Sequence, residues 1–189
     1  AGQPVVTIGR EYTHAYWVKL RASKDGWRTL FRGNSDHCFI VSAGSTDIGM
    51  YSNRDGASRK ACTAPQTSST GCDRHHIVPG SCAFVVVTGV STSTGSAVGV
   101  SDFYVGSLTT PPEHAGSADR VCSGTQYARL GYGTTQGPGK VARVMAWDRA
   151  LSPEEIEMVH RRTGPESPTE SQCLVMGAWS KPTSSPMNR

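Results

Sequence analysis

The sequence has no long hydrophobic run. Its longest apolar segment spans only residues 83–87, whereas a helix needs about 20 apolar residues to cross a bilayer. We therefore expect no transmembrane segment in this sequence. Helical periodicity is also scarce, and it occurs in a single stretch near residue 155. These absences favour a protein built from sheets over a helical bundle.

The residue patterns of the common enzyme classes are also missing. Hydrolysis of a glycan needs two carboxylates that face one groove, and two acids on one strand share a face only at alternate positions. No predicted strand carries such a pair, since the Glu residues lie in the predicted helix, in the C-terminal segment, or singly at Glu11 and Glu113. The chain also lacks a G-x-S-x-G elbow, a P-loop and a G-x-G-x-x-G turn before a helix. We therefore expect that the protein is not an enzyme.

The six cysteines are an even number, and no two of them form a C-x-x-C pair. This pattern favours disulfide bonds and hence an oxidising compartment. Two alternatives stay open, namely buried free thiols and a zinc site built from Cys72, His75, His76 and Cys82. Six cysteines allow about 15 pairings, so the connectivity is not predictable. The disulfide candidates are Cys38, Cys62, Cys72, Cys82, Cys122 and Cys173.

Short segments rich in β-branched and aromatic residues recur along the chain and are bounded by turn residues. The 21 Gly and 11 Pro suit such a series of strands and tight turns. The pattern predicts strands over residues 5–9, 15–22, 28–33, 38–44, 48–53, 82–90, 102–108, 128–133 and 140–147. This many short strands with one helix predict an all-β fold, an antiparallel β-sandwich.

One helix is predicted over residues 153–162, with a full set of boundary signals. Ser152 suits the N-cap, Pro153 suits the first helical position, and Glu155 completes a capping box. Gly164 and Pro165 favour the end of the helix. The apolar stripe is too narrow for a bundle, so we expect the helix to lie at one edge of the sandwich. The stripe comprises Leu151, Ile156 and Val159.

The stretch GKVARVMAWDRALSPEEI, residues 139–156, resembles the last strand and following helical turn of laminin-G-like, or concanavalin-A-like, lectin and glucanase domains. Earlier segments match the same family in order, with YWVKL (16–20), FVVVTGV (84–90) and FYVGSL (103–108) as landmarks. The resemblance implies a jelly-roll sandwich, similar to that of pentraxins, over residues 1–164. Such folds serve lectins, glycan hydrolases, calcium-dependent adhesion modules and structural subunits.

Calcium is the cofactor that the resemblance implies, because relatives often bind it at the rim of the sandwich. The candidate ligands are Asn53, Asp55 and Asp148, which provide hard oxygen atoms at predicted loop positions. Asn-x-Asp-Gly is also an ordinary turn sequence, and Asp148 can simply anchor the bend before the helix. Both interpretations stay open on the sequence.

Arginine dominates the positive charge, with 14 of the 19 basic residues. Arg favours bidentate contacts with carboxylate, sulfate or phosphate groups, and aromatic side chains near loops can stack on sugar rings. A scattered, solvated surface is the alternative explanation. The modest net charge of +4, without a basic stripe interleaved with aromatics, argues against a nucleic-acid partner. The candidate ligand-binding residues are Trp27, Arg28, Arg32, Tyr127 and Tyr132.

Residues 165–189 are predicted to form a Pro- and Ser-rich extension that Cys173 can tether to the sandwich. The segment SKPTSSPMNR (180–189) has too little apolar content to order itself, so we expect a partner to hold it. The sequence thus predicts a non-catalytic recognition or structural module that docks a protein or glycan surface. We expect it to be an accessory subunit of a larger extracytoplasmic assembly, whether secreted, at the cell surface or in an oxidising lumen. A free carbohydrate-binding lectin, with calcium as its candidate cofactor, is the alternative, and a glycan-cleaving enzyme is the third hypothesis.

Overall fold

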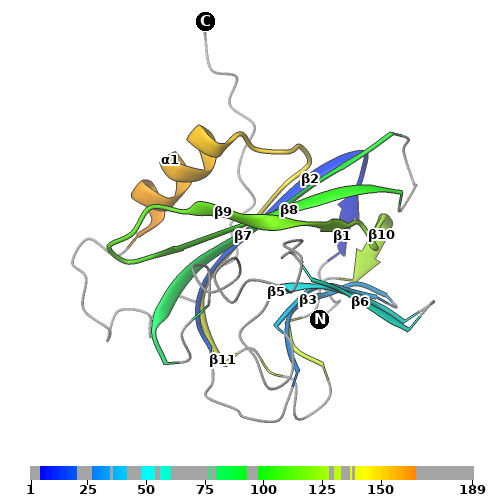
Figure 1. Ribbon diagram of the computed structural model, residues 1–189, viewed down its shortest axis with the longest axis horizontal. Coiled ribbons are helices and arrows are strands. Elements are labelled where there is room, and N and C mark those ends of the chain that lie inside the picture. Colours follow the sequence, from blue (N-terminus) through cyan, green and yellow to red (C-terminus); the bar gives the residue numbers. More distant parts are fainter. Residues whose placement is uncertain are drawn as a thin grey trace, which may run out of the picture.

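The fold is taken from a computed structural model of the chain, and Figure 1 shows its elements. The described residues are 5–20, 27–34, 36–41, 48–53, 56–60, 77, 80–92, 98–127, 130–132, 137 and 139–164. Within these ranges no helix is long and apolar enough to cross a membrane. The predicted extension, residues 165–189, lies outside the described residues.

Two antiparallel sheets form the body of the molecule. The larger sheet has the strand order β11-β2-β7-β8-β9, the smaller has the order β3-β4-β5-β6, and β1 pairs with β10. This is the antiparallel jelly-roll β-sandwich expected from the sequence. The strands are β1 (Val5–Ile8), β2 (Glu11–Leu20), β3 (Arg28–Arg32), β4 (His37–Val41), β5 (Ile48–Ser52), β6 (Ala57–Lys60), β7 (Cys82–Ser91), β8 (Gly99–Ser107), β9 (Glu113–Asp119), β10 (Gly124–Tyr127) and β11 (Gly139–Trp147).

The strand predictions are confirmed in most places, with differences at two kinds of position. β2 begins at Glu11, whereas the predicted strand begins at residue 15. Residues 130–132, part of the strand predicted over 128–133, are not in a strand, and the nearest strand is β10. β6 and β9 carry no strand signal, since ASRK and EHAGSAD lack β-branched and aromatic residues. Both are edge strands, so their conformation comes from backbone pairing with β5 and β8.

The main hydrophobic core lies between the two sheets. Alternate residues of β2, such as Tyr16 and Val18, face this core, and Phe39 of the small sheet meets Phe103 of the large sheet with ring centroids 5.4 Å apart. Burial of each large apolar side chain contributes about 1.5 to 3 kcal/mol. The core therefore holds the two sheets in a fixed relation, which positions the residues on their outer faces.

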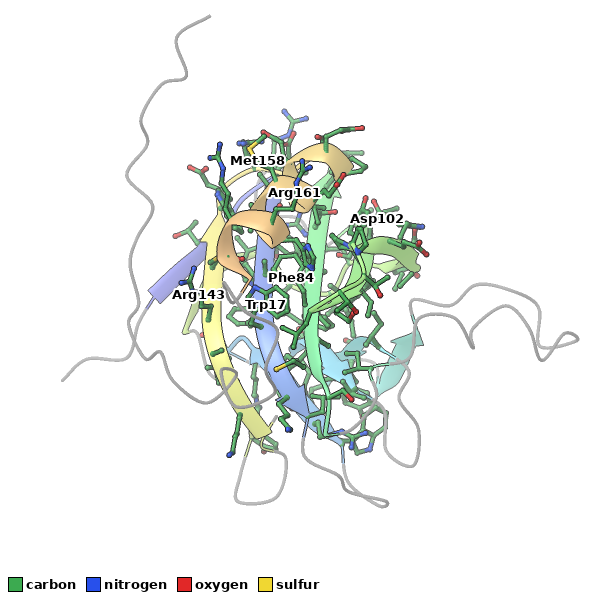
Figure 2. All side chains as sticks on the ribbon, turned by 90° about the vertical axis from the view of Figure 1, so that its left-hand side faces the viewer. Trp17, Phe84, Asp102, Arg143, Met158 and Arg161 are labelled. Atoms are coloured by element: carbon green, nitrogen blue, oxygen red, sulfur yellow. A yellow bond between two sulfur atoms is a disulfide. The ribbon has the colours of Figure 1, made fainter. Side chains whose placement is uncertain are left out.

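Helix α1 (Pro153–Thr163) covers part of the outer face of the five-stranded sheet, as Figure 2 shows. The capping box is confirmed, because Ser152 Oγ accepts from the Glu155 amide and the Glu155 carboxylate accepts from the Ser152 amide. Ile156 is only 1% exposed and belongs to a second core with Trp17 and Phe84. These two aromatic residues lie on the inner strands β2 and β7, so α1 rests on the sheet face, further in than the edge position that we expected.

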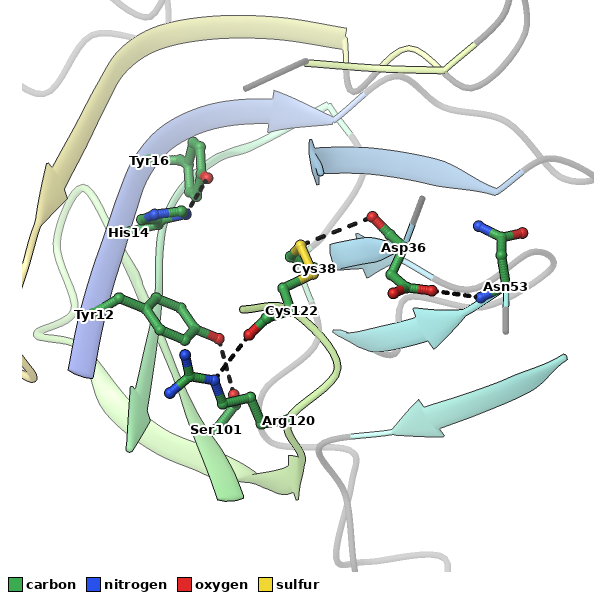
Figure 3. Close-up of a disulfide and its surroundings, with 9 residues drawn as sticks. All are labelled: Tyr12, His14, Tyr16, Asp36, Cys38, Asn53, Ser101, Arg120 and Cys122. Carbon is green, nitrogen blue, oxygen red and sulfur yellow. Dashed lines mark hydrogen bonds between the residues drawn. A yellow bond between two sulfur atoms is a disulfide. The ribbon is translucent and has the colours of Figure 1, made fainter. Parts of the chain in front are cut away.

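A disulfide joins Cys38 on β4 to Cys122, which lies between β9 and β10 (Figure 3). Cys82, the first residue of β7, is also disulfide-bonded. The prediction of disulfides is therefore confirmed for the three described cysteines. The zinc alternative loses one ligand, because an oxidised Cys82 has no thiolate to offer. The partner of Cys82 lies outside the described residues and is one of Cys62, Cys72 and Cys173.

Arg120 fastens the segment next to this disulfide. Its guanidinium donates to the backbone carbonyls of Gly9, Arg10 and Cys122, and lies 5.0 Å from the centroid of the Tyr12 ring. Burial lowers the pKa of Arg120. These contacts hold the turn between β1 and β2 against the segment that leads into β10.

Candidate functional site

A pocket of about 330 Å³ opens on the outer face of the four-stranded sheet. Its described lining comes from segments that are far apart in the sequence: the residue before β3, two residues of β4, the end of β5, and the segment after β10. The pocket is therefore a product of the tertiary fold. The described lining residues are Trp27, His37, Ile40, Tyr51, Asn53 and Tyr132.

The local geometry of β4 and β5 explains why these side chains face outward. Met50 is buried in the core, so strand alternation places Tyr51 on the opposite face. On β4 the pairing with β5 is irregular between His37 and Ile40. Because of this irregularity, Phe39 and its neighbour at position 38 both enter the core, while His37 and Ile40 line the pocket.

Aromatic rings form most of the pocket wall. The Trp27 and Tyr51 ring centroids lie 6.0 Å apart, and the His37 ring packs edge-on against Tyr51 at 6.0 Å and against Tyr132 at 5.3 Å. The Arg32 guanidinium lies 3.7 Å from the centroid of the Tyr132 ring. Such cation–π and edge-to-face contacts hold the rings in defined orientations. The wall therefore presents fixed aromatic surface to whatever enters the pocket.

His37 supplies a polar group in this aromatic surrounding. Its Nδ1 lies 3.0 Å from Thr29 Oγ1 on the neighbouring strand. Burial lowers the pKa of His37, the positive charge of Arg32 lowers it further, and the negative charge of Asp36 partly opposes both effects. The imidazole is therefore neutral at neutral pH, and its other ring nitrogen can serve as a hydrogen-bonding group for a ligand.

Asn53 lies at the rim of the pocket. Its backbone N–H donates to Asp36 Oδ1 at 2.8 Å, a contact that joins the ends of β4 and β5 (Figure 3). The Asn53 side-chain amide carries both donor and acceptor atoms. Together with His37, it adds groups that can donate and accept hydrogen bonds to a mainly aromatic pocket.

The fold brings together some of the candidate ligand-binding residues and separates others. Trp27 and Tyr132 line the pocket, and Arg32 packs on Tyr132. Arg28 is 2% exposed, and burial lowers its pKa, so it is not available as a surface anchor. Tyr127 lies on β10, paired with Val5, and its side chain lies outside the description.

Sequence reasoning missed three pocket residues, His37, Ile40 and Tyr51. Alternation from the apolar residues Ile48 and Met50 could have placed Tyr51 on the outer face. His37 had no usable signal, since its outward position depends on the irregular pairing of β4. Of the aromatic residues that line the pocket, the sequence predicted Trp27 and Tyr132 but not Tyr51 or His37.

The calcium candidates lie on different parts of the sandwich. Asn53 is at the pocket rim on the small sheet, whereas Asp148 is exposed directly after β11 of the large sheet. Asp55 lies outside the described residues. Among the residues that the structure describes, no three His, Cys, Asp or Glu side chains gather into a group that could hold a metal. Calcium binding by this set stays a prediction.

Comparison with known families assigns this sequence to a superfamily. A family model described as the concanavalin A-like lectin/glucanases superfamily matches residues 1–157. The chain belongs to this superfamily. The resemblance of residues 139–156 to laminin-G-like domains is thereby confirmed at the level of the family. No curated protein matches the sequence of this concanavalin A-like domain.

Among solved structures, the domain is similar to Trypanosoma rangeli sialidase in complex with 2,3-difluorosialic acid, a covalent intermediate. The two chains share 12% sequence identity with a TM-score of 0.46, and the match covers 83% of this chain and 24% of the sialidase chain. The concanavalin A-like domain thus spans about a quarter of the length of that chain.

Proposed function

We propose that this concanavalin A-like domain recognises carbohydrate without cleaving it, and that its pocket on the four-stranded sheet binds a single terminal sugar unit. One observation carries the proposal: Trp27, Tyr51 and Tyr132 line the pocket together with His37 and Asn53. Aromatic faces pack on the apolar faces of sugar rings, while a few placed polar groups fix the orientation of a ligand. The volume of about 330 Å³ is near the lower end for ligand pockets and suits a small end group.

The chemistry of the lining supports binding rather than hydrolysis. Glycosidases use two carboxyl groups that flank the scissile bond. None of the six described lining residues is Asp or Glu. The two adjacent acids of α1 have structural contacts: Glu155 completes the capping box and pairs with Arg149, and Glu154 accepts a hydrogen bond from Ser152 Oγ.

The disulfides support an extracytoplasmic setting. The Cys38–Cys122 bond and the oxidised Cys82 are typical of proteins that fold in oxidising compartments. The idea of an accessory subunit rests on residues 180–189, which lie outside the described residues. It stays a prediction, which purification of the native protein from its source would test.

A panel of immobilised oligosaccharides, followed by calorimetry with the best binder, tests the pocket. We expect Trp27→Ala and Tyr132→Ala each to weaken binding at least tenfold, about 1.4 kcal/mol, because each removes an aromatic wall. Arg161→Ala, on the exposed side of α1, is the control and should bind like the unaltered protein. Incubation with the same oligosaccharides should release no reducing ends.

Two results would contradict the proposal. The first is binding that both pocket variants retain, which would place the sugar elsewhere on the domain. The second is turnover of an oligosaccharide, which would mean that carboxylates distant in the sequence form a catalytic pair.

A further inference from the structure

The turn between β8 and β9 presents an exposed threonine, Thr110, directly before two prolines. The backbone of Thr110 is engaged on both sides. Its N–H donates to Ser107 Oγ at 3.0 Å, and its carbonyl accepts from the Ser107 N–H at 2.9 Å. Its side-chain hydroxyl, Oγ1, makes no hydrogen bond to any described residue. The turn therefore holds the backbone of this residue in place and leaves the hydroxyl open to solvent.

Contacts with the body of the domain fix the position of this turn. The carbonyl oxygen of Ser107 lies 2.7 Å from His160 Nε2 on α1, and Leu108 packs against the second core beneath the helix. The returning chain passes close to Gly106, where a Cβ atom would lie 2.9 Å from the Pro112 nitrogen. The turn is consequently a well-packed part of the sandwich, and the residues at its tip project from a defined base.

The two prolines restrict the backbone around Thr110. A residue that precedes proline is confined to extended conformations, because the proline ring collides with a helical neighbour. This restriction acts on Thr110, which precedes Pro111, and again on Pro111, which precedes Pro112. An enzyme that modifies a side chain loses less conformational entropy when the segment it binds is already extended. Residues 110–112 therefore have the backbone of an acceptor peptide before any enzyme binds them.

The setting of the domain indicates which modification this hydroxyl receives. The Cys38–Cys122 disulfide and the oxidised Cys82 fit an extracytoplasmic compartment, where sugars are added to exposed side chains. The sequence contains no Asn-x-Ser/Thr acceptor for an N-linked sugar. Hydroxyl groups next to proline are typical of segments that carry O-linked sugars. Thr110 combines such a sequence with an exposed and unengaged hydroxyl.

We propose that Thr110 Oγ1 is an acceptor for O-linked glycosylation from a nucleoside diphosphate sugar. Oγ1 forms a bond to the anomeric carbon of the sugar, and the bond between that carbon and the diphosphate oxygen breaks. The nucleoside diphosphate leaves with the electron pair of the broken bond, and a base of the transferase takes the hydroxyl proton. The neighbouring Thr109 is the poorer acceptor, because its Oγ1 lies 3.4 Å from Ser107 Oγ and no proline follows it.

Peptide mapping of the native protein, purified from its source, tests this site. After digestion, the peptide that contains Thr110 should carry the additional mass of a hexose or an N-acetylhexosamine, and electron-transfer fragmentation should place that mass on Thr110. Thr110→Ala, produced in the same cells, should lose the additional mass. Thr109→Ala is the matched control and should keep it. Unfolding midpoints of both variants check that the turn still folds.

Three results would overturn the proposal. The first is a native protein in which Thr110 is unmodified or carries phosphate. The second is a sugar located on Thr109, and the third is a sugar that this peptide retains in Thr110→Ala. The outcome does not depend on the proposed function, because none of the six described lining residues of the pocket belongs to this turn.

Discussion

His14 is a titratable side chain inside the hydrophobic core. It lies on β2 between Tyr12 and Tyr16, its ring packs edge-on against Phe31 at 4.5 Å, and its Nε2 has no partner among the described residues. Burial lowers the pKa of His14 from 6.5 to about 4. The folded protein therefore holds this imidazole in its neutral form.

The stability of the domain should consequently fall in acid. Above pH 6.5 His14 is neutral in both states and favours neither. As the pH falls from about 6.5 to about 4, the unfolded chain gains a proton at His14 that the folded chain does not, so folding loses about 3 kcal/mol in all. Urea unfolding of the protein and of His14→Leu at pH 7.5 and 4.5 measures this contribution. A stability difference between the two proteins that does not change with pH would refute it.

At the scale of elements, two kinds of contact stabilise α1: the N-cap within the helix and the packing of its buried side chain on the sheet. Ser152 Oγ satisfies an amide at the helix start, whereas Ile156 sits in the second core at 1% exposure. The first contact is partly exposed to solvent and the second is buried. Loss of the cap should therefore cost less than loss of the buried side chain.

Substitutions in α1 should follow this order. Ser152→Ala should destabilise the domain by about 1 kcal/mol, and Ile156→Ala by about 2 to 5 kcal/mol. Thermal and urea unfolding measure both, with Arg161→Ala on the exposed side as the control. If Ile156→Ala proves as mild as the control, the helix does not pack on the sheet as described. Sugar binding should be unchanged in both variants, because the pocket lies on the other sheet.

At the scale of the whole molecule, the Cys38–Cys122 disulfide joins β4 of the small sheet to the segment that follows β9 of the large sheet. The two cysteines are 84 residues apart in the sequence. A cross-link over a loop of this length restricts the unfolded chain strongly, and the chain-entropy treatment gives about 4.5 kcal/mol. Arg120 fastens the same region through three backbone carbonyls.

Removal of this cross-link should destabilise the entire sandwich. The double variant Cys38→Ala/Cys122→Ala should lose about 2 to 5 kcal/mol of unfolding free energy. Peptide mapping without reduction should find Cys38 linked to Cys122 and a second bridge from Cys82 to one of the three remaining cysteines. Free thiols at Cys38 and Cys122 in the native protein would contradict both the pairing and the oxidising compartment.

The sequence by itself determined the features that depend on neighbouring residues. The capping box around Ser152 satisfies amides within one turn, and the alternation of large apolar residues in strands such as 82–90 marks a buried strand without reference to its partners. The stretch 139–156 also pointed to the family, because a strand, a turn and a helix start are all encoded there in order. Each of these signals involves only residues that are close together in the chain, so it can be recognised in the sequence.

Only the tertiary structure decided the rest. β6 and β9 are strands because their backbones pair with β5 and β8, and their own residues do not favour strands. The pocket joins Trp27, His37, Tyr51 and Tyr132 across loops and pairing irregularities that no local pattern reveals. The bond between Cys38 and Cys122 was likewise fixed by the fold and not by the sequence. The physical reason is that contacts between distant segments depend on the packing of the whole core. The residues that make such contacts are not linked by any local pattern in the sequence.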